Sequence, residues 1–321
     1  MKVLFASVLA SFAAGFGVAW YLQPSPAPAL VASTRTVDAP AWPPGVQRPG
    51  PPLPWTAPPS AIGAPGLQQA GVDELWRKAL VPHDKQETGY AAEDRLRQLV
   101  QTDPTARRKL LQRFHIANTL EERELFKSIM STVRTPEVIA FSHSLASSLN
   151  VSERKFGFEM LQALAPNAPE TRSLVRRALV SEQSPAVLVQ ALATLRPGVT
   201  EPEEASALVA QLKSLSVHAD PAVRSMSLTQ LGQLDKTGEG SERLAQALSD
   251  GVPEVRQAAI FAIAQTGLRS EPLKLGLLAL VNNAQESREV RGSALQVLER
   301  FPLTREEVAS YTQARGRILG L

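Results

Sequence analysis

The sequence predicts an all-α protein whose main body is an array of repeated helical hairpins. Three segments near the carboxyl end, residues 220–228, 252–260 and 287–295, align with one another without gaps. Within such segments the apolar residues recur with the period of an α-helix, and prolines stand where helices would begin. No stretch shows the alternation of apolar and polar residues that is typical of a half-buried strand.

The first element along the chain is an apolar segment. Residues 3–22 carry no charge over 20 residues, about what a helix needs to cross ~30 Å of hydrocarbon. A cleaved secretory signal is the alternative, but its apolar core is usually about 7–15 residues long and a small-x-small site follows it. The nearest such site, at residues 27–29, lies among prolines well beyond the apolar run. We therefore favour an uncleaved transmembrane signal anchor over residues 1–23.

The charges around this segment predict its orientation. Lys2 precedes it and no basic residue follows before Arg35, so the amino end should stay in the cytoplasm. The body would then lie outside a single-pass inner membrane, in the periplasm of a host with two membranes, or be secreted there if the segment is cleaved. Ser7, Ser11 and Gly15 recur every four residues, a pattern that would also permit a homodimer through the membrane helix.

Residues 24–66 form the second element, a proline-rich linker. They hold 13 of the 25 prolines and show no apolar periodicity. Proline fixes the backbone torsion and removes a hydrogen-bond donor, which predicts a disordered, extended and semi-rigid segment. At ~3.1 Å per residue it could span on the order of 100 Å. A docking ligand for an aromatic groove, built on Trp42 and Trp55, is the less favoured alternative.

The third element, residues 67–321, contains the repeat. Its anchor is a valine, followed by arginine in three copies, with further copies at Val187 and, more weakly, at residues 153 and 122; the steps between anchors are 31 to 36 residues. That spacing accommodates two helices and two turns. The repeat positions are Val223 and Arg224; Asp250, Val255 and Arg256; and Val290 and Arg291.

Helix boundaries are marked throughout this body. Gly267 stands where a helix would stop, and Thr304 with Glu307 forms a capping box for the last helix. Prolines in a first helical turn lose nothing, because their missing donor would be unpaired there. They mark second helices at Asp103-Pro104, Thr135-Pro136, Glu201-Pro202 and Glu271-Pro272, and first helices at Ser184-Pro185 and Asp220-Pro221.

On these residues the chain resembles HEAT-type repeats, especially the short HEAT-like variety of the phycobilin lyases, which have an armadillo-type fold. The resemblance is specific over residues 184–300, weaker over 120–183, and rests on spacing over 72–119. It implies a right-handed α-solenoid of about seven hairpins, with first helices on the convex side and second helices lining the concave side. It also implies that Arg224, Arg256 and Arg291 form a buried ladder, bonded to aspartate side chains or carbonyls of adjacent turns.

No catalytic motif is present. There is no cysteine, and no nucleophile elbow, phosphate-binding glycine loop or zinc-protease helix. His115 and His143 occupy matching places in successive repeats, but two histidines without carboxylates make a poor metal site. Residues 67–321 hold 31 basic and 30 acidic side chains, too balanced for a nucleic-acid binder. We expect neither enzyme activity nor a cofactor or metal.

One uneven charge feature predicts a binding surface. If second helices line a groove, its first half is basic, while the helix after residue 201 opens with acidic residues. Such a groove could select an acidic protein segment or an anionic polymer; solvated faces with ion pairs between repeats are the alternative. The candidate partner-binding residues are Arg107, Arg108, Lys109, Arg113, Arg172, Arg176 and Arg177.

These features predict a membrane-tethered scaffold that binds one or more proteins in an assembly of the cell envelope, because stacked hairpins create a long groove. Two alternatives stay open. One is a HEAT-like enzyme such as a chromophore lyase. The other is a passive structural spacer that binds nothing through the groove.

Overall fold

A computed structural model of the chain describes residues 71–80, 86–197 and 202–319. They belong to one compact unit, Ser60–Leu321. The predicted membrane segment and proline-rich linker lie outside the described residues. Among the helices that are described, none is both long and apolar enough to span a bilayer.

Helices account for all the regular structure in these residues, which contain no strand. A first helix, α2 (Val72–Ala79), precedes seven helical hairpins. The hairpins are α3 (Gln86–Thr102) with α4 (Pro104–Arg113); α5 (Leu120–Met130) with α6 (Pro136–Ala146); α7 (Val151–Leu164) with α8 (Pro169–Ser181); α9 (Pro185–Thr194) with α10 (Pro202–Leu215); α11 (Pro221–Leu234) with α12 (Ser241–Ala247); α13 (Pro253–Thr266) with α14 (Glu271–Asn282); and α15 (Arg288–Leu298) with α16 (Arg305–Leu319). A 3₁₀ turn, η2 (Phe114–Ile116), continues α4.

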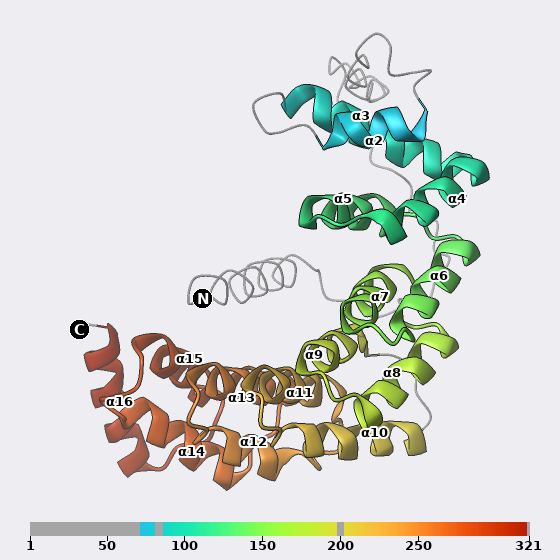
Figure 1. Cartoon of the computed structure of the whole chain (residues 1–321). Helices are drawn as coiled ribbons and strands as arrows, with labels where there is room; N and C mark the ends of the chain where they lie inside the picture. The colour runs from blue at the N-terminus through green and yellow to red at the C-terminus, as the bar shows by residue number, and fades with distance from the viewer. Residues whose placement is uncertain (1–70, 81–85, 198–201, 320–321) are drawn as a thin grey trace, which may run out of the picture. The chain divides into compact units, whose positions relative to one another are not determined.

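Successive hairpins stack in chain order (Figure 1). The first helices α7, α9, α11, α13 and α15 each pack on the next, and the second helices α12, α14 and α16 do the same. Helix α2 packs on α3 and α4 at the start of the stack. Each repeat therefore buries its apolar face mainly against its neighbours, as an α-solenoid does.

The repeat anchors have one structural position. Val187, Val223, Val255 and Val290 are each the third residue of a first helix, and each is at most 4% exposed. The residues aligned with them, Glu122 in α5 and Glu153 in α7, also stand third. The spacing of 31 to 36 residues is thus the separation along the sequence between the starts of consecutive first helices.

The predicted helix boundaries are present. Five of the six marked prolines are the first residue of a helix, and α14 begins at Glu271, one residue before its proline. Gly267 ends α13 in the left-handed conformation, with φ 69°. At α16 the Thr304 N–H donates to Glu307 over 2.7 Å, and the Glu307 N–H donates to the Thr304 hydroxyl over 3.3 Å. The capping box is therefore confirmed.

The buried side chains form two clusters. One extends from Val72 to Leu164 and the other from Ala146 to Ile318, so both include side chains of α7. The first contains most of the aromatic side chains, whereas the second is built largely of leucine, valine, isoleucine and alanine. The N-terminal hairpins are thus held by larger and less interchangeable side chains than the C-terminal ones.

Candidate functional site

Arginines near the start of the first helices tie consecutive hairpins together. Arg224 in α11 donates from Nε and Nη2 to both carboxylate oxygens of Asp250, each over 2.9 Å. Its Nη1 donates to the carbonyls of His218 and Ala219, each over 3.0 Å. One guanidinium thereby caps the preceding turn and binds the turn that precedes α13.

The same arrangement occurs one and two hairpins away. Arg154 in α7 donates to Glu182 from Nε over 2.7 Å and from Nη2 over 3.0 Å, and its Nη1 donates to the carbonyl of Leu149 over 2.9 Å. Arg256 in α13 forms an ion pair of 2.6 Å with Glu286 and donates to the carbonyl of Asp250 over 2.7 Å. We call these contacts the arginine ladder.

The ladder differs in detail from the expectation. Two of its three carboxylates, Glu182 and Glu286, are glutamates rather than aspartates, and sequence reasoning missed both. Each ladder carboxylate lies 26 to 30 residues after its arginine, a spacing that could have identified them. Helix α9 has buried Leu188 at the arginine position, and the Nε of Arg291 has no hydrogen-bond partner within the described part of the chain.

Two ladder carboxylates have a pKa below the 4.5 of a free glutamate. The hydrogen bonds from Arg154 are the largest cause of the lowered pKa of Glu182, and Arg256 has the same effect on Glu286. Each carboxylate is therefore ionised more readily in the folded chain than in the unfolded one. Its contribution to stability is present above the unfolded pKa and is lost as the pH falls through the lower folded value.

The melting temperature of the full chain should consequently fall as the pH is lowered from about 5 to about 3, and Glu182→Gln should weaken this dependence. At neutral pH the variant should be the less stable chain, because Arg154 loses its charged partner. The two melting temperatures should converge in acid. Thermal melts followed by circular dichroism measure this, with Glu254→Gln on the exposed side of α13 as the matched control. Melting temperatures that stay parallel at every pH would contradict it.

Three of the candidate partner-binding residues are engaged within the stack. Arg107 is only 9% exposed and pairs with Glu137 of the next hairpin over 3.2 Å. Lys109 and Arg113 both pair with Asp73, over 2.5 and 2.6 Å, and so fasten α2 to α4. Each of these three side chains holds neighbouring elements together.

Among the other four candidates, Arg108, Arg176 and Arg177 are exposed and Arg172 is half-buried. Arg108 donates a hydrogen bond to the carbonyl of Pro104 in its own helix, over 3.4 Å. On α8, Arg176 pairs with Glu204 of α10 over 3.0 Å, Arg172 donates to the carbonyl of residue 167 over 3.3 Å, and Arg177 donates to the hydroxyl of residue 173 over 3.2 Å. The seven residues therefore form two separate sets, on α4 and on α8, and the hairpin of α5 and α6 lies between them.

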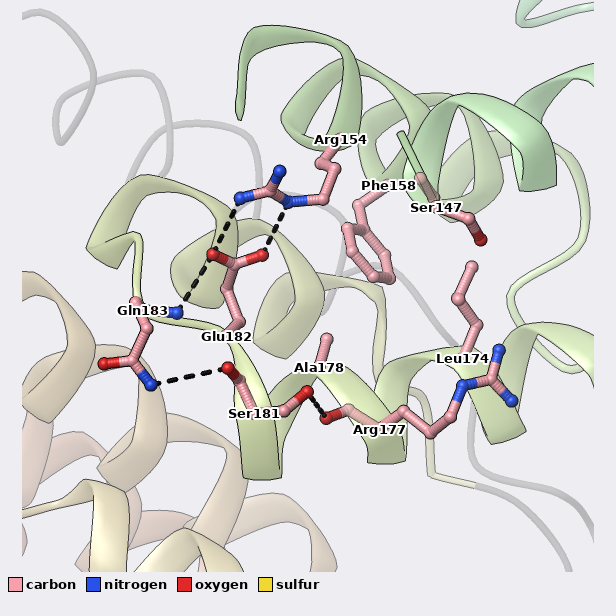
Figure 2. A pocket seen from close by; sticks show the side chains of 10 residues that line it. Ser147, Arg154, Phe158, Leu174, Arg177, Ala178, Ser181, Glu182 and Gln183 are labelled. Atoms are coloured by element: carbon pink, nitrogen blue, oxygen red, sulfur yellow. Dashed lines mark hydrogen bonds and ion pairs between the residues drawn. The ribbon is translucent and has the colours of Figure 1, made fainter. Parts of the chain in front are cut away.

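An open cavity of about 540 Å³ lies beside the α8 set (Figure 2). The Arg154–Glu182 pair lies along one wall, and the Arg177 side chain extends along α8 away from the Glu182 carboxylate (Figure 2). Phe158 and Leu174 are the large apolar side chains of the lining. The cavity is lined by Ala146, Ser147, Arg154, Phe158, Leu174, Arg177, Ala178, Ser181, Glu182 and Gln183. No sequence pattern marked it, because its walls come from two successive hairpins.

The two histidines at matching repeat positions do not meet. His115 contacts the rings of Phe114 and Phe141 edge to face, whereas the Nε2 of His143 lies 2.9 Å from the Thr171 hydroxyl. Burial lowers the pKa of His143. Across the ranges that the structure covers, no three histidine, aspartate or glutamate side chains gather to hold a metal ion.

Comparison with known proteins gives a match over part of the chain. Residues 205–299 match the family model of HEAT repeats. No curated protein matches the sequence. The chain therefore carries a recognisable HEAT signature from α10 to α15.

Solved structures with a similar course of the chain include an engineered protein, with 17% identity, 78% of this chain and 73% of that chain covered, and a TM-score of 0.42. A designed armadillo repeat protein in complex with the peptide (KR)4 has 17% identity, 73% and 100% coverage and a TM-score of 0.40. The complex of CpcE and CpcF of phycocyanin lyase from Nostoc sp. PCC7120 has 14% identity, 82% and 99% coverage and a TM-score of 0.36. The described residues therefore form an α-solenoid of stacked helical hairpins, of which residues 205–299 match HEAT repeats.

Proposed function

We propose that the chain is a non-enzymatic scaffold that binds another protein through its helical stack. The observation that carries this proposal is the surface at the α7–α8 hairpin. There, two successive hairpins leave an open cavity beside a helix that carries three exposed or partly exposed arginines. Solenoids use such surfaces, extended over several repeats, to hold partners.

The proposal includes a location and a groove. Residues 3–22 would anchor the chain in the inner membrane, residues 24–66 would act as a spacer, and the solenoid would lie on the outer side of that membrane as part of an envelope assembly. A right-handed stack with α8 and the other second helices on its concave side would present the arginines of α8 to a partner there. The uncharged apolar run and the proline content support the location.

Covalent capture in intact cells tests this function. A membrane-impermeant amine crosslinker, applied to cells with a permeabilised outer layer, should join the full-length protein to a defined partner identified by mass spectrometry. Reversing Arg172, Arg176 and Arg177 to glutamate should abolish that adduct, because like charges would then meet the partner's acidic surface. The charge reversal Arg305→Glu, at an exposed arginine of α16 outside the candidate set, is the matched control.

The outcomes separate the parts of the proposal. A partner captured equally by the wild type and the triple variant would indicate a passive strut or a different binding face. An adduct that forms only after the cells are lysed would refute the outward location while leaving the scaffold function in place. Absence of any specific adduct on either side would contradict the scaffold function itself.

A further inference from the structure

The cavity beside α8 combines a charged group that lacks a countercharge with an apolar wall. Two arginines line it. Arg154 is held by both oxygens of Glu182, whereas Arg177 has only a hydrogen bond of 3.2 Å to the Ser173 hydroxyl of its own helix. Within the part of the chain that the structure describes, Arg177 forms no ion pair. An exposed guanidinium beside a cavity can bind a carboxylate through two parallel hydrogen bonds.

Apolar side chains lie both inside and around the cavity. Phe158 and Leu174 line it, and they are 1% and 7% exposed. Leu149, in the turn between α6 and α7, is 99% exposed, and Val180, one turn of α8 beyond Arg177, is 74% exposed. Leu149 is two residues from Ser147 and Val180 is next to Ser181, and both serines line the cavity. Exposed aliphatic side chains at both places favour an occupant that passes across the cavity rather than one that only enters it.

The charges on the helices around the cavity favour a segment with one carboxylate over a polyanion as its occupant. Helix α6, on one side of α8, contains no lysine or arginine, and α10, on the other side, has Glu203 and Glu204 in its first turn. A polyanion such as a nucleic acid needs a continuous run of cations to release its counterions. Glu182 neutralises Arg154 of α7, so the lining arginine without a countercharge is Arg177 on α8, which matches a short segment with a single carboxylate.

We propose that this cavity binds an extended segment of a partner protein in which an aspartate or glutamate lies next to an aliphatic residue. The carboxylate would pair with Arg177, and the aliphatic side chain would pack against Phe158 and Leu174. The flanking residues of the segment would cover Leu149 and Val180. This inference rests on the proposed scaffold function and assigns to it one site and one partner chemistry.

A direct binding assay tests the site. The probe is a fluorescent twelve-residue peptide with alternating leucine and glutamate at its centre, and fluorescence anisotropy measures its binding to the full chain in detergent. We expect saturable binding that weakens about tenfold or more in Arg177→Gln. The matched control is Arg305→Gln, at an exposed arginine of the second helix α16 that also has no ion pair in the described structure, and it should bind as the wild type does.

A second variant tests the apolar part of the site without changing the charge of Arg177. The double variant Leu149→Ser, Val180→Ser changes two exposed side chains. It should lower the affinity for the peptide several-fold without changing the melting temperature of the chain. A peptide with glutamine in place of glutamate should bind at least about tenfold more weakly than the probe.

Four results would overturn the proposal. They are equal binding of the glutamine peptide, unchanged binding by Arg177→Gln, no saturation up to about 1 mM, and displacement of the probe by a twelve-nucleotide oligothymidylate of similar length. The capture experiment distinguishes this failure from that of the scaffold function. If the Arg177→Gln variant captures a partner as well as the wild type does, the scaffold function stands and only this binding site is refuted.

Discussion

Replacing Phe126 with alanine should lower the free energy of unfolding of the full chain by about 3–5 kcal/mol. Phe126 in α5 is fully buried, and its ring lies 5.1 Å from that of Phe114, 5.9 Å from that of Phe156 and 6.1 Å from that of Phe141. These four rings belong to three successive hairpins. Removing the Phe126 ring would therefore leave a cavity that affects both interfaces between these repeats.

Urea denaturation measures this loss, followed by circular dichroism and by the tryptophan fluorescence to which Trp76 contributes. Trp76 is 1% exposed and belongs to the same buried cluster as Phe126. The matched control is Phe261→Ala on α13, where the side chain is 40% exposed and its removal should cost less than about 1 kcal/mol. Equal losses in the two variants would show that the aromatic cluster does not hold the N-terminal hairpins together.

Much of this fold could be predicted from the sequence because its determinants are local. A proline in a first helical turn, a glycine after a last turn and a capping box each act within four residues. For this reason Pro185, Gly267 and the Thr304–Glu307 box lie where the pattern placed them. The repeat anchor also has one local position, because the valine that stands third in α9, α11, α13 and α15 is buried in the stack.

The candidate site could be predicted less well, because it depends on which side chains meet across a repeat interface. Arg107 and Arg177 are both arginines on second helices, and charge alone does not distinguish them. Packing does: Glu137 of the next hairpin pairs with Arg107, whereas no described carboxylate reaches Arg177. The same limit applies to Glu182, whose role depends on the position of Arg154 in the preceding hairpin.

The ladder also has a physical reason for using carboxylates in turns. Glu182 accepts hydrogen bonds from the backbone N–H groups of Gln183 and Ser184 as well as from Arg154. The carboxylate thereby satisfies donors that α9 cannot pair at its start. A single acidic side chain joins the hairpins and orders the turn between them, so its removal should affect both.

Close contact between first helices gives a substitution whose effect is opposite to that expected from helix propensity. Gly232 lies within α11, where alanine would normally stabilise a helix by about 1 kcal/mol. A Cβ atom at this position, however, would lie 2.5 Å from the Cα and 2.8 Å from the Cβ of Ala262 in α13. Ala262 is itself fully buried, so neither helix can yield without separating the two repeats.

Gly232→Ala should therefore lower the free energy of unfolding by about 2 kcal/mol, because the cost of overpacking exceeds the gain in propensity. The matched control is Gly292→Ala in the middle of α15, where no atom lies within 4 Å of the new Cβ; it should raise the free energy of unfolding by about 0.5–1 kcal/mol. Urea titrations of the two variants measure the difference. If Gly232→Ala stabilises the chain as Gly292→Ala does, then α11 and α13 approach less closely than the structure shows. A loss at position 232 alone would confirm that the stack depends on a glycine that the repeat pattern did not mark.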